Sequence, residues 1–95
     1  MNEINKTKLI EKFIYELPVL RAKFGITQSD LSKIIGVSRQ TYSSLETGKR
    51  RMTWSNFLSI LFVFYFNSTT RKMLKTSGIF TNSLKGILNI DRKDK

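Results

Sequence analysis

The sequence predicts an all-helical protein, and three features support that fold class. Apolar residues recur three and four positions apart, and no stretch alternates regularly between apolar and polar residues. Only five glycines and one proline interrupt the 95 residues. A hydrophobic content of 40%, with seven phenylalanines, is sufficient for a compact core. We therefore expect a single domain over residues 1–95, built from five or six helices.

Composition excludes several function classes. The chain has no cysteine and no histidine, which rules out zinc fingers, disulfide frameworks, thiol nucleophiles and histidine acid–base catalysis. The seven carboxylates are scattered, and neither a Walker-type phosphate loop nor a GxGxxG fingerprint occurs. We therefore do not expect an enzyme, and we predict no catalytic residue, no metal site and no cofactor.

The formal net charge of +10 predicts a polyanionic partner, because the release of counterions from such a partner favours binding. The alternative is that the charge serves solubility alone. The first seventeen residues contain no uninterrupted apolar run of the kind that secretion signals need. A cytoplasmic location is the default expectation.

The N-terminal part of the chain predicts a helical extension over about residues 7–17. Its apolar stripe has helical spacing and consists of Leu9, Ile10, Phe13, Ile14 and Leu17. Pro18 lacks a backbone donor and disfavours helix at Leu17. We therefore expect a break or kink near Leu17, with the first helix of the core unit (about 18–66) beginning at Pro18.

Two short helices joined by a tight turn follow. Thr27 is placed to cap the first of them, with Asp30 three residues later as in a capping box. Its predicted buried face consists of Leu31, Ile34 and Ile35. Gly36 can adopt the positive φ of a sharp turn, and Ser38 is placed to cap the second helix, residues 38–47.

The second short helix leads into a basic loop and a longer apolar helix. Tyr42 and Leu45 lie on one face of the second helix, which leaves its other residues free to touch a ligand. The loop contains Lys49–Arg51, and Thr53 is placed to cap a helix over about residues 54–67.

That longer helix is apolar nearly all round, so we expect it to be covered on more than one side. Thirteen residues, 54–66, are too few to span a bilayer. The face expected to pack on the two short helices consists of Trp54, Phe57, Leu58, Leu61 and Tyr65. The face that needs another cover consists of Ile60, Val63 and Phe64. The N-terminal helix, the C-terminal segment and a second subunit are the three possible covers.

Short helices are predicted over about residues 69–90. Ser68 or Thr69 is placed to cap one that continues through Lys75, and Gly78 follows it. A last helix over residues 81–90 is weakened by Gly86.

Nine positions have the spacing of a known motif: Gln28, Leu31, Ser32, Gly36, Val37, Ser38, Leu45, Glu46 and Gly48. This pattern resembles the helix-turn-helix of the lambda-repressor-like (Cro-repressor/XRE) family, over about residues 18–66. The resemblance implies a compact five- to six-helix DNA-binding domain whose third helix, residues 38–47, enters the major groove.

The resemblance also implies roles for single residues. The residues expected to read bases are Arg39, Gln40, Thr41 and Ser44. The residues expected to bind phosphate are Gln28, Ser38, Ser43, Lys49, Arg50 and Arg51. Gln28 is also placed to brace residue 39, and Arg21 resembles the arginine that pairs with the glutamate at position 46. Tyr42 departs from the family, which has Ile or Val there, so its hydroxyl must find a partner or reach the surface.

We therefore expect a DNA-binding transcriptional regulator of repressor type, acting as a homodimer on double-stranded DNA. Part of helix 54–67 is expected at the dimer interface. No membrane association and no small-molecule ligand are predicted. The alternative is a protein-interaction module such as the antitoxin of a toxin–antitoxin pair, because an uncovered apolar face usually marks an interface.

Overall fold

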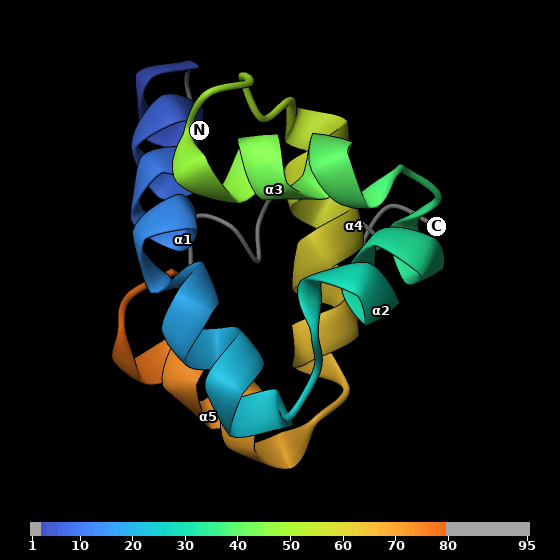
Figure 1. Cartoon of the computed structure of the whole chain (residues 1–95). Helices are drawn as coiled ribbons and strands as arrows, with labels where there is room; N and C mark the ends of the chain where they lie inside the picture. The colour runs from blue at the N-terminus through green and yellow to red at the C-terminus, as the bar shows by residue number, and fades with distance from the viewer. Residues whose placement is uncertain (1–2, 80–95) are drawn as a thin grey trace, which may run out of the picture.

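The structure, a computed structural model, describes residues 3–79, and this part of the chain forms five helices and no strand. They are α1 (Glu3–Phe24), α2 (Gln28–Ile35), α3 (Arg39–Thr47), α4 (Trp54–Tyr65) and α5 (Ser68–Thr76). Figure 1 shows α3 across the top, α4 behind it, α1 along one side and α5 at the bottom. The all-helical prediction is confirmed. The helix expected over residues 81–90 lies outside the described residues.

Helix α1 runs through Pro18 without a break, so the prediction that a new helix begins there is wrong. Figure 1 shows instead that α1 changes direction partway along. A proline inside a helix costs about 3 kcal/mol. Leu17 and Leu20 are 0% and 1% exposed, and burying each side chain contributes about 1.5–3 kcal/mol. Packing on both sides of Pro18 therefore offsets the local penalty.

The N-cap of α5 is Asn67, not Ser68 or Thr69 as expected. The Asn67 backbone is extended, and its Oδ1 accepts the backbone N–H of Thr70 at 3.0 Å. The buried Thr70 hydroxyl donates to the carbonyl of Phe64 at 2.6 Å. The start of α5 is thus bonded to the last turn of α4, which ends earlier than predicted.

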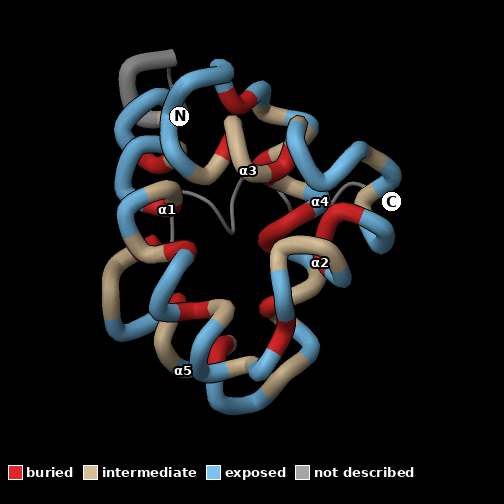
Figure 2. Tube along the Cα trace, viewed as in Figure 1, coloured by how far each residue is buried: buried red, intermediate tan, exposed pale blue. Residues whose placement is uncertain are grey.

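An aromatic cluster joins α1 to α4. The Phe13 ring lies edge-on to Phe57 and Phe64, with centroid distances of 5.0 and 6.5 Å. The Phe24 ring meets Phe64 at 5.7 Å. Figure 2 shows the buried parts of the helices turned towards the interior of the molecule. Of the three possible covers for the face that contains Phe64, the N-terminal helix and the C-terminal segment are both observed, because α1 and α5 each pack on α4.

The face of α4 that was expected to need a further cover is covered in the structure. Ile60 and Phe64 are both 0% exposed, and α1 and α5 both pack on α4. Phe62 and Phe66, which belong to neither of the two expected faces, are 64% and 66% exposed.

Candidate nucleic-acid interface

The ends of α2 are fixed by local hydrogen bonds. The Thr27 Oγ1 accepts the backbone N–H of Asp30 at 3.0 Å, and the Asp30 carboxylate accepts the N–H of Thr27 at 3.3 Å. Gly36 has a φ of 82°, which side-chain-bearing residues rarely adopt, and its N–H donates to the carbonyl of Ser32 at 2.9 Å. The predicted capping box and sharp turn are both present. The prediction that Ile34 lies on the buried face of α2 is wrong, because its side chain is 60% exposed.

The next helix, α3, presents one face to the core and the other to the outside. Tyr42 and Leu45 are 0% exposed. At about 100° per residue, Gln40 lies opposite this buried pair, Ser44 lies about 50° from the point opposite it, and Arg39 and Thr41 lie on the two flanks. Arg39 and Gln40 are exposed, and Thr41 and Ser44 are partly exposed. Of the four residues predicted to read bases, Gln40 is thus nearest the centre of the outer face of α3 and Thr41 is nearest the buried side.

Two hydroxyl groups at the start of α3 are bonded to each other. The Ser38 Oγ accepts the backbone N–H of Thr41 at 3.0 Å and donates to the Thr41 Oγ1, also at 3.0 Å. Ser38 therefore acts as the helix cap, and a phosphate contact by its hydroxyl would compete with the Thr41 hydroxyl. Ser43 is partly exposed, and its carbonyl accepts a hydrogen bond from Thr47 at 3.0 Å.

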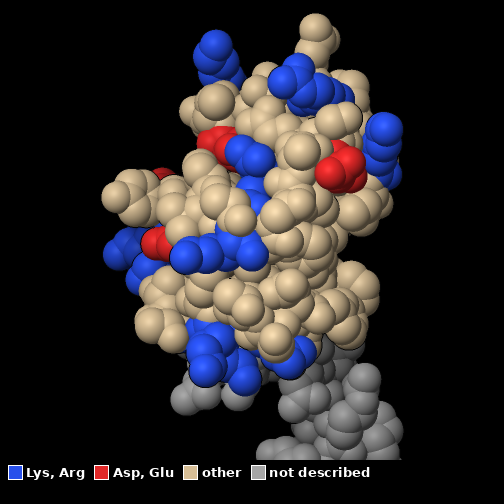
Figure 3. Space-filling view, turned by 60° about the horizontal axis from the view of Figure 1, so that its bottom comes forward, with Lys and Arg blue, Asp and Glu red and all other residues tan. Residues whose placement is uncertain are grey.

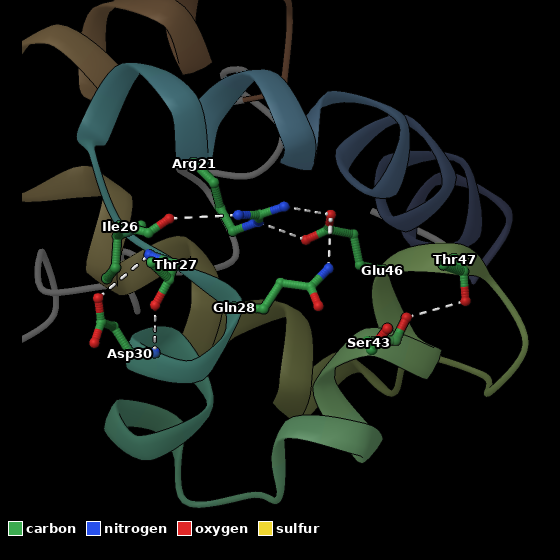
Figure 4. Close-up of polar contacts among 8 residues, drawn as sticks. All are labelled: Arg21, Ile26, Thr27, Gln28, Asp30, Ser43, Glu46 and Thr47. Atoms are coloured by element: carbon green, nitrogen blue, oxygen red, sulfur yellow. Dashed lines mark hydrogen bonds and ion pairs between the residues drawn. The ribbon is translucent and has the colours of Figure 1, made fainter.

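A charged pair ties α3 to α1. The Arg21 Nε and one terminal nitrogen donate to the two carboxylate oxygens of Glu46 at 2.8 and 2.9 Å. The Arg21 side chain is 21% exposed and that of Glu46 is 7% exposed. Figure 4 shows Arg21 and Gln28 reaching Glu46 from α1 and α2. The pairing implied by the family resemblance is therefore present in the structure.

The pKa values of this pair move in opposite directions. The hydrogen bond to Glu46 raises the pKa of the Arg21 guanidinium. Burial by itself would raise the pKa of Glu46, but the hydrogen bond from Arg21 and its positive charge hold that pKa below its ordinary value. Both groups are therefore charged at neutral pH.

Gln28 takes part in the same cluster, which the sequence pattern did not reveal. Its side-chain amide donates to the Glu46 Oε2 at 3.3 Å. Gln28 was expected to brace residue 39, at the start of α3, but this bond leads to the last turn of that helix. The amide of Gln28 thus links the start of α2 to α3 and has a defined orientation.

The Tyr42 hydroxyl does not reach the surface and has no hydrogen bond of normal geometry, contrary to expectation. It lies close enough to the pair formed by Arg21 and Glu46 to interact with both. Burial raises the pKa of the Tyr42 phenol far above its usual range, and the Glu46 carboxylate raises it further. Packing of the large ring against the core outweighs the loss of one hydrogen bond with water, because the ring has a large apolar area.

The basic loop after α3 borders a groove. Lys49, Arg50 and Arg51 are all exposed, and the Arg50 N–H donates to the carbonyl of Ser44 at 3.0 Å. The groove between this loop and the first half of α1 has a volume of about 900 Å³. Lys6 and Trp54 both line this groove, and the Lys6 Nζ lies over the Trp54 ring, 5.0 Å from its centroid. Nothing in the sequence pattern connects Lys6 with this loop.

Positive charge is not confined to α3 and its loop. Figure 3 shows the face that is reached when the bottom of Figure 1, where α5 lies, is turned forward. Lys and Arg side chains are spread across it, with acidic side chains at only a few places. The distribution of positive charge therefore does not by itself single out α3 and its loop as a binding surface.

The described part of the chain contains neither a candidate metal site nor a membrane-spanning helix. Within residues 3–79, no three His, Cys, Asp or Glu side chains are grouped so that they could hold a metal ion. No helix in the same range combines the length and hydropathy that crossing a bilayer requires.

Comparison with known proteins gives one match. Residues 20–53 match a family model described as helix-turn-helix. The matched segment begins inside α1, contains all of α2 and α3, and ends at the cap of α4. No curated protein and no solved structure matches the chain.

Proposed function

From the lambda-repressor-like (XRE) helix-turn-helix that residues 20–53 form, we propose that the chain is a sequence-specific transcriptional regulator of repressor type. It acts in the cytoplasm as a homodimer and reads the major groove with α3. One observation carries this proposal. The outer half of α3 bears polar side chains that are accessible to solvent. On its inner half, Tyr42 and Leu45 are buried in the core and Glu46 is bonded to Arg21.

Arg39 and Gln40 are the principal base-reading residues of the proposal. An arginine can bond O6 and N7 of guanine together, and a glutamine can bond N6 and N7 of adenine in the same way. Both residues are exposed in the first turn of α3. Thr41 and Ser44 are less exposed and offer single hydroxyl contacts or, for Thr41, a methyl contact with thymine.

Phosphate binding is assigned to the two ends of the motif. Gln28 begins α2, where free backbone N–H groups favour an anion. Its side-chain amide is already bonded to Glu46, so the carbonyl of that amide is held in one direction and the backbone N–H is the better phosphate donor. Lys49, Arg50 and Arg51 supply charge from the loop, and Ser43 adds a hydroxyl from α3.

The proposal takes the chain to bind DNA as a homodimer. Two recognition helices on one face of the duplex would read half-sites on the order of 10 bp apart in a roughly palindromic site. With roughly 6–10 phosphates contacted, affinity should fall by about 10³–10⁵ between 50 and 200 mM salt. No cofactor or small-molecule ligand is part of the proposal.

Selection of bound duplexes from a random DNA pool tests sequence reading. We expect enrichment of a palindromic motif by the full chain. A variant with Arg39→Ala and Gln40→Ala should enrich a shorter or degenerate motif, while Lys23→Ala, an exposed change on α1, serves as the matched control. Enrichment of no motif, together with binding no stronger than that of a charge-matched helical protein, would refute the proposal.

The second candidate function is a protein-interaction module such as an antitoxin. The observation that favours it is the exposure of Phe62 and Phe66, because adjacent exposed aromatic residues often mark an interface. Light scattering on the purified chain distinguishes the two candidates. A homodimer would account for these residues without a foreign partner, whereas a monomer that forms a stable complex only with another protein would favour the module.

A further inference from the structure

Four residues of α4 and its cap form a single exposed stripe, which we call the α4 stripe: Ser55, Ser59, Phe62 and Phe66. Their spacings of four, three and four keep them within about 60° of one another around the helix axis. Phe66 follows the last residue of α4 and still has helical backbone angles, φ −84° and ψ −4°. The stripe is therefore straight, with two small residues at one end and two large ones at the other.

The positions in the α4 stripe are symmetric about a point between Ser59 and Phe62. If a second copy of α4 lies antiparallel across this point, Ser59 faces the partner's Phe62 and Ser55 faces the partner's Phe66. In such an isologous contact the same surface serves both subunits. Each large ring then meets a small side chain, which allows the two helices to approach closely. A parallel arrangement would place ring against ring and leave a gap between the serines.

The distribution of charged residues also favours α4 as the surface of contact between two copies. The chain has a net charge of +10, so two copies repel each other over most orientations. Among the five described helices, α4 alone contains no Asp, Glu, Lys or Arg. Contact through the α4 stripe therefore buries apolar area without bringing charged groups of the two helices directly together.

The polar atom at the centre of the α4 stripe is compatible with burial. The Ser59 Oγ donates to the backbone carbonyl of Ser55 at 3.0 Å, so covering it leaves no unsatisfied donor. The rings of Phe62 and Phe66 are edge-on at 4.7 Å and form one apolar block. The centre of the stripe and its Phe62–Phe66 end are thus suited to a dry contact.

We propose that the chain forms a two-fold dimer through antiparallel contact of two α4 stripes, with Phe62 and Phe66 of each subunit packed on Ser59 and Ser55 of the other. This inference rests on the homodimer of the proposed function and specifies its interface. The dimer forms without DNA. Its association strengthens with added salt, because salt screens the repulsion between two cationic subunits, whereas binding to DNA weakens with salt.

Cysteine cross-linking tests the antiparallel register. Because the chain has no native cysteine, any disulfide must form between the introduced residues. Ser55→Cys and Phe66→Cys variants are prepared with tags of different size and oxidised separately and as a mixture. Antiparallel contact predicts a disulfide only in the mixture, because position 55 of one subunit would lie about 16 Å along the axis from position 55 of the other. If each variant forms a disulfide with itself and no disulfide joins the two different variants in the mixture, the proposed register is wrong.

Sedimentation equilibrium without DNA tests the interface itself. Phe62→Lys should weaken dimerisation at least tenfold, because it replaces an apolar contact with a charge at the centre of the α4 stripe. Tyr15→Lys, which changes a residue that is 82% exposed on α1, is the matched control and should leave dimerisation unchanged. Circular dichroism verifies that both variants remain helical. Equal weakening by both variants would contradict the proposed interface.

Binding to a single DNA half-site separates the two proposals. Phe62→Lys should bind a half-site as the unchanged chain does and lose only the cooperative binding to a full palindrome. A wild-type chain that remains monomeric at all concentrations overturns the α4 dimer, as does an α4 stripe found covered by residues 80–95 or by a different protein. Failure of the wild type to bind a half-site would refute the proposed DNA binding. It would not affect the test of dimerisation, which is made without DNA.

Discussion

The Arg21 guanidinium on α1 holds the Glu46 carboxylate on α3 through two hydrogen bonds of 2.8 and 2.9 Å. The two residues are 25 positions apart in the chain. This pair connects the long helix α1 to the last turn of α3, and the amide of Gln28 connects α2 to the same carboxylate. The orientation of α3 is therefore fixed by polar contacts as well as by apolar packing.

Arg21→Ala should lower the free energy of unfolding by roughly 2–4 kcal/mol, because it leaves the mostly buried Glu46 carboxylate without its partner. Lys49→Ala, which removes an exposed cation, should change that free energy by less than about 0.5 kcal/mol. Urea unfolding measures both. If Arg21→Ala costs no more than Lys49→Ala, the pair contributes little to stability.

The same pair predicts a dependence of stability on pH. The pKa of Glu46 in the folded chain lies below its ordinary value of 4.5. Its contribution is therefore fully present above about pH 4.5 and is lost as the pH falls through the lower folded value. The difference in unfolding free energy between the wild type and Glu46→Gln should be constant near neutral pH and shrink in acid. A difference that stays constant down to about pH 2 would show that Glu46 has no lowered pKa.

Tyr42→Phe should be neutral or should stabilise the fold by about 1 kcal/mol. The substitution removes a buried hydroxyl that has no hydrogen bond of normal geometry and keeps the ring. Tyr42→Ala, which also removes the ring, should cost about 3–5 kcal/mol. Thermal unfolding of the wild type, Tyr42→Phe and Tyr42→Ala gives their order of stability. A loss of more than about 1 kcal/mol in Tyr42→Phe would mean that the hydroxyl has a partner in solution.

The proposed roles of Arg39 and Lys49 differ in a measurable way. Arg39→Ala should cost about 1–3 kcal/mol on the selected site and relax preference at one base pair. Lys49→Ala should weaken binding to all sequences alike and reduce the salt slope by about 1. Fluorescence anisotropy at several salt concentrations, on the selected site and on a scrambled one, separates the two effects. Loss of preference in Lys49→Ala would reverse the assignment.

Local patterns were sufficient to predict much of the fold. Thr27, Gly36 and Ser38 act within three or four residues of their own positions, so the ends of α2 and α3 follow from short stretches of sequence. The family match over residues 20–53 includes all nine positions that carry the resemblance, among them Gly36 and Ser38. The base-reading and phosphate-binding roles remain predictions.

Long-range packing explains what local patterns missed. The continuity of α1 through Pro18 depends on contacts with α4 and α5, which the proline itself does not reveal. The bond from Gln28 to Glu46 joins two helices, and the buried hydroxyl of Tyr42 depends on how α3 is rotated. Which side of α4 is exposed depends on the position of Phe13, which is remote in sequence.

The aromatic cluster of α1 and α4 has a consequence for modularity. The segment that matches the family model, residues 20–53, contains neither Phe13 nor Phe57 nor Phe64, although all three are fully buried. A peptide cut to that segment, or the segment grafted onto another scaffold, would therefore contain α2 and α3 but not the buried aromatic side chains that pack beneath them. The motif can be recognised in isolation, but its shape is a property of the longer chain.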